Sequence, residues 1–230
     1  MNEKNKLPDS NEKRAKILIV DDHPIVRDGL VRLINKKAEK DLMICGEADN
    51  AADALKTIAK IRPDLVMVDI SLRGGDGIEL TKSIRYQNSK LPILVLSMHD
   101  ELLYAERALR AGANGYIMKN EPSEDLLQAI RKVLSGGVYI SENVSSEIVH
   151  KLKRDGPGSL SSPVASLSDR ELEVFNLLGR GRTTRQVADE LFISMKTVET
   201  HLSRIKVKLD LDSYNELVVH AALWVNSRSS

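Results

Sequence analysis

The sequence has little cysteine, few aromatic residues and no long apolar run. Its single cysteine, Cys45, excludes an internal disulfide and a zinc cluster of the CxxC type, and its apolar neighbours favour a buried thiol in a reducing cytoplasm. Only 3% of the 230 residues are aromatic, which indicates aliphatic packing. Every apolar run falls short of the roughly 18 residues of a membrane span, so we expect a cytoplasmic protein without membrane association. Residues 1–15 are predicted to be a mobile tail, not a signal peptide.

The net charge is also small, at +1, so bulk electrostatics give no sign of nucleic-acid binding. The charge is unevenly distributed, however. Between Arg180 and Lys208 the sequence has seven basic and three acidic residues. Because a phosphate backbone responds to local charge, this stretch is a candidate nucleic-acid contact.

Between residues 16 and 135, short apolar runs alternate with stretches of helical spacing. The predicted strands are Ile17–Val20, Leu42–Cys45, Leu65–Val68, Ile93–Leu96 and Gly115–Met118. The predicted helices lie near 25–34, 51–61, 77–86, 101–111 and 123–134. This alternation predicts an α/β domain with a five-stranded parallel, doubly wound sheet. Ligands of such sheets bind at the carboxyl ends of the strands.

Residues 136–166 are predicted to be a linker with a possible short helix from about Glu142 to Lys153, because glycine, proline and serine interrupt the pattern there. Residues 167–226 then show helical spacing alone and predict a small all-α domain. Its four helices are expected to begin near Ser168, Thr184, Ser194 and Ser213, the first and last with a glutamate at capping-box spacing. The second and third helices have the spacing of a helix-turn-helix.

Three carboxylates are expected to meet at one edge of the sheet. Asp21 and Asp22 follow the first strand, and Asp69 ends the third, which is its neighbour in a doubly wound sheet. Three carboxylates repel each other unless a cation is present, and oxygen ligands suit Mg²⁺. The sequence therefore predicts a metal-assisted phosphate site.

Two further strand ends add groups that suit phosphate. Lys119 follows the fifth strand and Ser97 follows the fourth, so an amine and a hydroxyl reach the same edge. Each residue alone has a simpler interpretation: Asp69 or Ser97 as a helix cap, Asp22 as a turn residue, Lys119 as a surface amine. The four strand ends taken together favour the phosphate site.

The third helix of the second domain has one apolar face, formed by Val198, Leu202, Ile205 and Leu209. The opposite face carries Lys196, Thr200, Ser203 and Val207, with Glu199 and Arg204 on its shoulders. Such a face suits a recognition helix in a major groove, where an acid such as Glu199 is tolerated best against a cytosine amino group. Phosphate contacts are expected from Thr197, His201 and Lys208. A merely solvated face is the alternative, and the preceding helix and tight turn favour DNA.

These motifs resemble a known family. Residues 16–135 resemble the flavodoxin-like receiver domain of bacterial two-component response regulators. The family has its acidic pair, phospho-accepting aspartate, switch hydroxyl, switch aromatic and lysine at the positions of Asp21-Asp22, Asp69, Ser97, Tyr116 and Lys119. The resemblance implies that Asp69 takes a phosphoryl group from a kinase histidine. It also implies Mg²⁺ held by Asp22, Asp69 and the backbone carbonyl oxygen of Ser71, with Asp21 acting through the metal's water. Arg73 departs from the family, which often has proline there.

Residues 167–225 resemble the LuxR-type helix-turn-helix domain through Leu167-Ser168, Arg170-Glu171, Ser194, Lys196-Thr197-Val198 and His201. The order of the two domains is similar to the NarL/FixJ subfamily. That resemblance implies a transcriptional regulator whose phosphorylation controls dimerisation, in part through the last helix near Leu217–Trp224, and promoter binding. The implied partners are a sensor histidine kinase, double-stranded promoter DNA, RNA polymerase and a second copy of the chain.

Two other function classes are possible from the residues. Haloacid-dehalogenase-type phosphatases also use a strand-end aspartate, but they need a second aspartate two residues later, where this chain has Ser71. We therefore expect no turnover enzyme, only self-phosphorylation from a phosphodonor and slow autodephosphorylation. The remaining alternative is a stand-alone receiver-type interaction module with a helical tail that binds no DNA.

Overall fold

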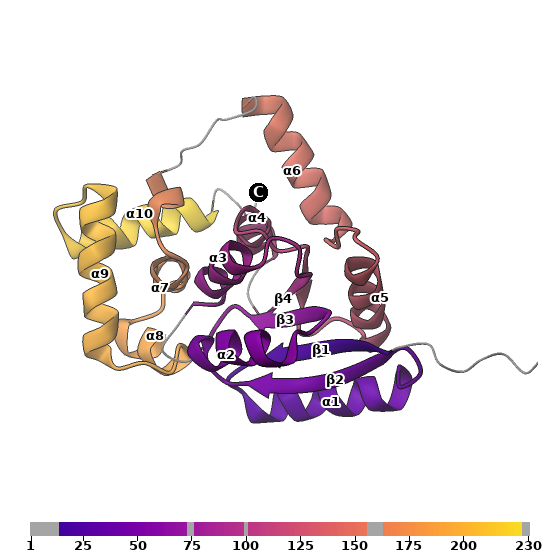
Figure 1. The fold of residues 1–230 in the computed structure, drawn as a ribbon. Helices are drawn as coiled ribbons and strands as arrows, with labels where there is room; N and C mark the ends of the chain where they lie inside the picture. The colour runs from indigo at the N-terminus through magenta and orange to yellow at the C-terminus, as the bar shows by residue number, and fades with distance from the viewer. Residues whose placement is uncertain (1–13, 73–75, 99–100, 156–162, 227–230) are drawn as a thin grey trace, which may run out of the picture. The chain divides into compact units, whose positions relative to one another are not determined.

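The computed structural model describes residues 14–72, 76–98, 101–155 and 163–226 (Figure 1). The chain divides into two compact units between Arg154 and Asp155, a point inside the predicted linker. Most of the predicted N-terminal tail lies outside the described residues, and Ala15 already belongs to the first strand.

The N-terminal unit alternates strands and helices. Its elements are β1 (Ala15–Val20), α1 (Pro24–Lys37), β2 (Leu42–Ala48), α2 (Ala51–Ile61), β3 (Leu65–Asp69), α3 (Gly77–Gln87), β4 (Ile93–Ser97), α4 (Glu101–Arg110), β5 (Gly115–Met118), α5 (Ser123–Leu134) and α6 (Glu142–Asp155). All strand pairs are parallel, in the order β2-β1-β3-β4-β5. The predicted doubly wound sheet is confirmed.

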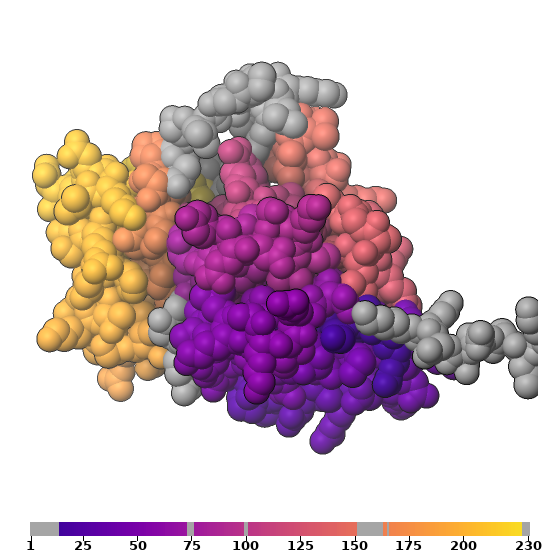
Figure 2. All heavy atoms as spheres, in the orientation of Figure 1, coloured from indigo at the N-terminus to yellow at the C-terminus, as the bar shows by residue number. Residues whose placement is uncertain are grey.

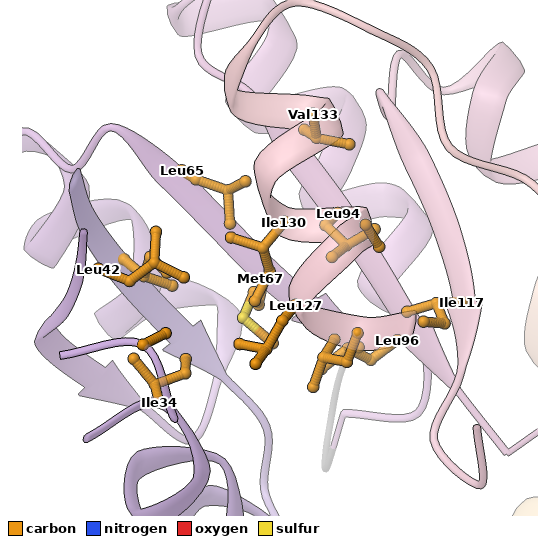
Figure 3. Close-up of a cluster of buried hydrophobic side chains, with 14 residues drawn as sticks. Ile34, Leu42, Leu65, Met67, Leu94, Leu96, Ile117, Leu127, Ile130 and Val133 are labelled. Carbon is orange, nitrogen blue, oxygen red and sulfur yellow. The ribbon is translucent and has the colours of Figure 1, made fainter. Parts of the chain in front are cut away.

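The sheet is buried because helices cover both faces. Alternate strand residues, among them Ile17, Met67 and Leu94, form one apolar cluster with α1 and α5 (Figure 3). The other faces of the strands lie toward α2, α3 and α4, which contact β1, β2, β3 and β5. In the space-filling view, the near side of this unit is a continuous surface of atoms (Figure 2). The strand sequences are therefore continuous apolar runs.

The sheet differs from its prediction at two places. Strand β2 continues past Cys45, the last residue of the predicted strand, to Ala48, beyond a register shift in its pairing with β1. Gly46 and Glu47 interrupt the apolar run, so the sequence pattern did not predict this part of the strand. The predicted linker also begins inside the sheet. Tyr139 donates its backbone N–H to the carbonyl oxygen of Asn114 (3.1 Å), and its own carbonyl oxygen accepts from the N–H of Tyr116 (2.8 Å).

The C-terminal unit contains the short 3-10 helix η1 (Pro163–Ser166) and helices α7 (Asp169–Gly179), α8 (Thr184–Glu190), α9 (Met195–Leu209) and α10 (Tyr214–Asn226). Ser168 and Glu171 form the predicted capping box of α7, and Ser194 caps α9. At α10 the predicted capping box is only partly formed. The N–H of Glu216 donates to Oγ of Ser213, but the carboxylate of Glu216 accepts from the N–H of Asp212 and not from that of Ser213. Within the described ranges, every helix is too short or too polar to cross a bilayer.

Arg85 ties together three parts of the N-terminal unit. From α3, its guanidinium donates to the carbonyl oxygen of Gly112 (2.6 Å), to Oδ1 of Asn114 (2.9 Å) and to the carbonyl oxygen of Ser89 (2.6 Å). Asn114 Oδ1 also accepts from the N–H of Ile93. The loops before β4 and β5 are therefore held by one side chain.

We expect Arg85→Met to lower the free energy of unfolding of the N-terminal unit by about 3 kcal/mol, since several charge-assisted hydrogen bonds are lost and their acceptors stay partly buried. Hydrogen exchange of β3 and β4 amides at native pH measures this value. Arg110→Met is the matched control, because Arg110 is 60% exposed and pairs with Glu106 on its own helix. That change is expected to cost no more than about 0.5 kcal/mol. Equal effects of the two substitutions would contradict the prediction.

Candidate functional site

The three predicted carboxylates lie at one edge of the sheet. Asp21 and Asp22 directly follow β1, and Asp69 is the last residue of β3, which is paired with β1 in register. Asp21 is fully buried, and Asp69 is 2% exposed. Two buried carboxylates side by side need positive charge to remain ionised.

Lys119 supplies part of that charge. Its backbone N–H donates to the carbonyl oxygen of Ser97, which places it directly after β5 at the same edge. Its Nζ lies 2.7 Å from Oδ2 of Asp21 and 2.8 Å from Oδ2 of Asp69. One ammonium ion thus contacts two buried carboxylates, and Asp22 adds a third negative charge at this edge.

The pKa of Asp69 is perturbed, mainly by burial. Burial raises the pKa of Asp69 to about 6; Lys119 opposes the rise, the negative charge of Asp21 adds to it, and a hydrogen bond from the backbone N–H of Ser71 opposes it. The carboxylate is therefore less stable in the folded protein than in the unfolded chain, where its pKa is 3.8. In a protein without metal, this difference acts against folding.

We expect the metal-free protein to lose stability as the pH rises through about 4 to 6, because the folded state binds more protons at Asp69 than the unfolded state does. At pH 7.5 in a chelator, Asp69→Asn should then be more stable than the wild type by about 2–3 kcal/mol, since one pKa unit corresponds to about 1.4 kcal/mol. Near pH 4 this gain in stability of Asp69→Asn over the wild type should vanish. Hydrogen exchange of the β3 amides at both pH values tests this, and a gain that does not depend on pH would contradict it.

The loop after Asp69 approaches its backbone closely. The N–H of Gly77 donates to the carbonyl oxygen of Ile70, and a Cβ built at Gly77 would lie only 2.0 Å from the carbonyl oxygen of Asp69. Only glycine fits there. Asp76 caps α3 by accepting from the N–H of Ile78. Arg73, the predicted departure from the family, lies outside the described residues.

The two predicted switch residues lie in neighbouring strands, β4 and β5. Ser97, the last residue of β4, is fully buried. Tyr116 in β5 is 2% exposed, and its hydroxyl lies 4.0 Å from Sδ of Met118. Without the family resemblance, the sequence favours a half-buried Tyr116 with its hydroxyl in water, and that interpretation is wrong because the side chain is buried.

Sequence reasoning missed two residues of this edge. His23 Nδ1 lies 2.9 Å from Oδ1 of Asp22 and 3.2 Å from Oδ1 of Asp21. Arg27, one helical turn into α1, donates to the carbonyl oxygen of Asp21 (2.5 Å) and to Glu47. Their positions after the acidic pair were the available signal, but a histidine before a proline is also common in turns.

The residues at this edge fit a divalent metal ion. Ligand atoms of Asp21, Asp22, His23 and Asp69 all lie within 4.8 Å of one another. Their carboxylate oxygens are the ligands that hard cations prefer, and a divalent ion would cancel the charge that Lys119 leaves uncompensated. This edge is thus compatible with divalent metal binding.

The C-terminal unit presents the predicted faces of α9. Val198, Leu202, Ile205 and Leu209 are buried against the rest of the unit. The exposed residues are Met195, Lys196, Thr197, Glu199, Thr200, Ser203, Arg204, Val207 and Lys208. Thr200 already donates its hydroxyl to the carbonyl oxygen of Lys196, and Thr197 bonds to the cap residue Ser194.

Lys208, one of the expected phosphate contacts, has partners inside the domain. Lys208 Nζ lies 2.6 Å from the buried carboxylate of Glu171 and also donates to the carbonyl oxygen of Ser166. Burial raises the pKa of Glu171, but the hydrogen bonds from Lys208 and Ser168 and the charge of Lys208 together outweigh burial, and the pKa is lowered overall. His201 is half-buried, and burial lowers its pKa, with Arg170 contributing. Lys208 therefore also anchors α9 to the start of α7.

Comparison with known proteins gives the same two parts. The family "Response regulator receiver domain" matches residues 17–131, and "Bacterial regulatory proteins, luxR family" matches residues 165–221. The oxygen regulatory proteins NreC of Staphylococcus haemolyticus and Staphylococcus aureus are each 36% identical over 210 residues, which cover 90% of this chain and 96% of each relative.

Solved structures of response regulators are also similar to this chain. A LuxR-family two-component response regulator from Aurantimonas is 36% identical and covers 62% of this chain and 100% of its own, with a TM-score of 0.57. The RcsB response regulator of Salmonella typhimurium is 25% identical and covers 91% of this chain and 99% of its own, with a TM-score of 0.54. An RcsB–DNA complex is also 25% identical, covers 91% of this chain and 98% of its own, and has a TM-score of 0.55. The chain therefore belongs to the NarL/FixJ subfamily of two-component response regulators, with a receiver domain followed by a LuxR-type DNA-binding domain.

Proposed function

We propose that Asp69 accepts a phosphoryl group from the phosphohistidine of a sensor kinase, and that this event controls dimerisation and promoter binding. The observation that carries the proposal is the arrangement of Asp69, buried at the end of β3, 2.8 Å from Lys119 and beside Asp21 and Asp22. A carboxylate nucleophile with a cation for the phosphoryl oxygens is what such a transfer needs.

In the proposed transfer, a carboxylate oxygen of Asp69 attacks phosphorus, the P–N bond to the kinase histidine breaks, and the released imidazole nitrogen takes up a proton. Lys119 stabilises the charge on the phosphoryl oxygens. Asp22, Asp69 and the carbonyl oxygen of Ser71 are proposed to hold Mg²⁺, with Asp21 binding through its water. The bound ion supplies positive charge to the same oxygens.

The phosphoryl group then acts as a switch. It adds up to about two negative charges, which attract the hydroxyl of Ser97 and the ammonium of Lys119. Movement of Ser97 changes the space next to Tyr116 and thereby the face formed by α4, β4 and β5. No external substrate is turned over, and slow hydrolysis at Asp69 returns the chain to its starting state.

The output is proposed to be DNA binding by the exposed face of α9, with its first turn, at Lys196, against the base edges. The response regulator RcsB, which is 25% identical and covers 91% of this chain, has been solved in complex with DNA, which supports this assignment. Paired half-sites fit a dimer, and contact with RNA polymerase at the promoter belongs to the same proposal.

Sedimentation and DNA-binding measurements with and without acetyl phosphate test the proposed function. We expect a monomer-to-dimer change and tighter binding to at least one genomic promoter fragment after phosphorylation. Unchanged mass, shape and DNA affinity would contradict it. Phosphorylation without binding to any fragment at low salt would favour the alternative, a receiver-type interaction module with a non-binding helical tail.

A further inference from the structure

His23 lies against the acidic residues of the proposed metal site. A single atom, Nδ1, is 2.9 Å from Oδ1 of Asp22, 3.2 Å from Oδ1 of Asp21 and 3.8 Å from Oδ2 of Asp69. The imidazole therefore faces the same small space as the three carboxylates. Its side chain is 47% exposed, whereas those of Asp21 and Asp69 are buried, so it stands on the solvent side of the site.

These separations are those of atoms around one metal ion. Six-coordinate ions with bonds of about 2.1 Å hold neighbouring ligand atoms about 3 Å apart and opposite ones about 4 Å apart. The distances from Nδ1 to the oxygens of the proposed ligands Asp22 and Asp69, 2.9 Å and 3.8 Å, fall close to or between these values. An ion can therefore be held with little movement of these side chains.

Backbone interactions fix the position of His23, from which the imidazole extends. The N–H of His23 donates to Oδ1 of Asp21 at 2.8 Å, and His23 is the residue that precedes the first turn of α1. Pro24 follows it at the start of the helix, where the ring of proline fixes φ. The position of His23 next to the acidic pair is thus set by local structure, independently of a metal.

We propose that His23 supplies a nitrogen ligand, through Nδ1, to the divalent ion at Asp21, Asp22 and Asp69, and that this shifts the preference of the site from Mg²⁺ toward Mn²⁺, Co²⁺ and Zn²⁺. The proposal rests on the metal site of the proposed function. Imidazole nitrogen is a good ligand for these transition metals, whereas Mg²⁺ takes oxygen ligands and water. One nitrogen among carboxylates therefore changes selectivity more than it changes Mg²⁺ affinity.

Electron spin-echo spectroscopy of Mn²⁺ bound to the full chain tests the ligand directly, because a coordinated imidazole modulates the echo through its ¹⁴N nuclei. We expect this modulation in the wild type and its loss in His23→Leu. In calorimetric titrations, the same variant should bind Mn²⁺ at least about tenfold more weakly and Mg²⁺ less than about threefold more weakly. His150→Leu, which changes an exposed histidine of α6, is the matched control and should retain the wild-type signal and affinities.

The outcomes separate this inference from the proposed function. If His23 only donates a hydrogen bond to the carboxylates, His23→Leu binds all the ions equally well or more tightly, and the inference is wrong while the metal site stands. The same conclusion follows if the ¹⁴N modulation is absent from the wild type or persists in His23→Leu. If the wild type binds neither Mg²⁺ nor Mn²⁺, both the inference and the metal site of the proposed function fail.

Discussion

Asp69→Asn is expected to abolish phosphoryl incorporation, with a loss of at least about 100-fold, because a neutral amide is a far weaker nucleophile than a carboxylate. The substitution keeps the size of the side chain, and the chain should stay folded since the buried charge of Asp69 opposes folding in the metal-free protein. Labelled acetyl phosphate, or a phosphorylated kinase, followed by phosphate-affinity electrophoresis measures the incorporation.

Asp53→Asn is the matched control for this experiment. Asp53 lies on α2 with its side chain 54% exposed and pairs with Lys56 on the same helix. That protein should take up label at the wild-type rate and release it with hydroxylamine, as acyl phosphates do. Wild-type incorporation into Asp69→Asn would place the acceptor elsewhere and remove the basis of the proposed switch.

The second large effect is expected on the affinity for promoter DNA. Replacing both Lys196 and Arg204 by alanine should weaken promoter binding by about 100-fold at moderate salt, since each charged contact to DNA contributes roughly 1–3 kcal/mol. Both side chains are exposed on α9. The slope of log affinity against log salt should also fall in magnitude by about two, because two fewer counterions are released. Fluorescence anisotropy across a salt series measures both quantities.

Lys90→Ala controls for the loss of positive charge as such, because Lys90 is an exposed lysine of the receiver domain. It should leave affinity and salt slope unchanged. Lys208→Ala is a different comparison: this lysine pairs with buried Glu171, so its removal should lower the stability of the C-terminal unit. An unchanged salt slope in the double variant would show that α9 does not face the phosphates.

The helices and strands could be predicted where the sequence pattern that defines them lies within the segment itself. Strand β5 and helices α2 and α5 have the predicted bounds, since apolar periodicity and breakers at the ends of a segment are read from neighbouring residues. The capping box at Ser168 and the buried face of α9 followed from spacing in the same way. The order β1-β3 was predictable because doubly wound sheets allow few topologies.

What could not be predicted depends on contacts between distant residues. The pairing of Tyr139 with β5 leaves no periodic signal, since it involves a single residue. The ion pair between Lys208 and Glu171 joins residues 37 positions apart, and spacing along α9 gives only the side of the helix. The direction of the His23 ring depends on the loop after β1, where neither helical nor strand periodicity applies.

The pairing of Tyr139 also bears on aggregation. Strand β5 is the last strand in the order of the sheet, and at its outer edge Tyr139 bonds to the N–H of Tyr116 and to the carbonyl oxygen of Asn114, just before the strand. Unprotected edges of this kind promote association between molecules. A receiver fragment that ends at residue 135 would expose the apolar edge next to Tyr116. One that continues through Ile140 would keep it covered, and we expect only the longer fragment to remain dispersed at high concentration.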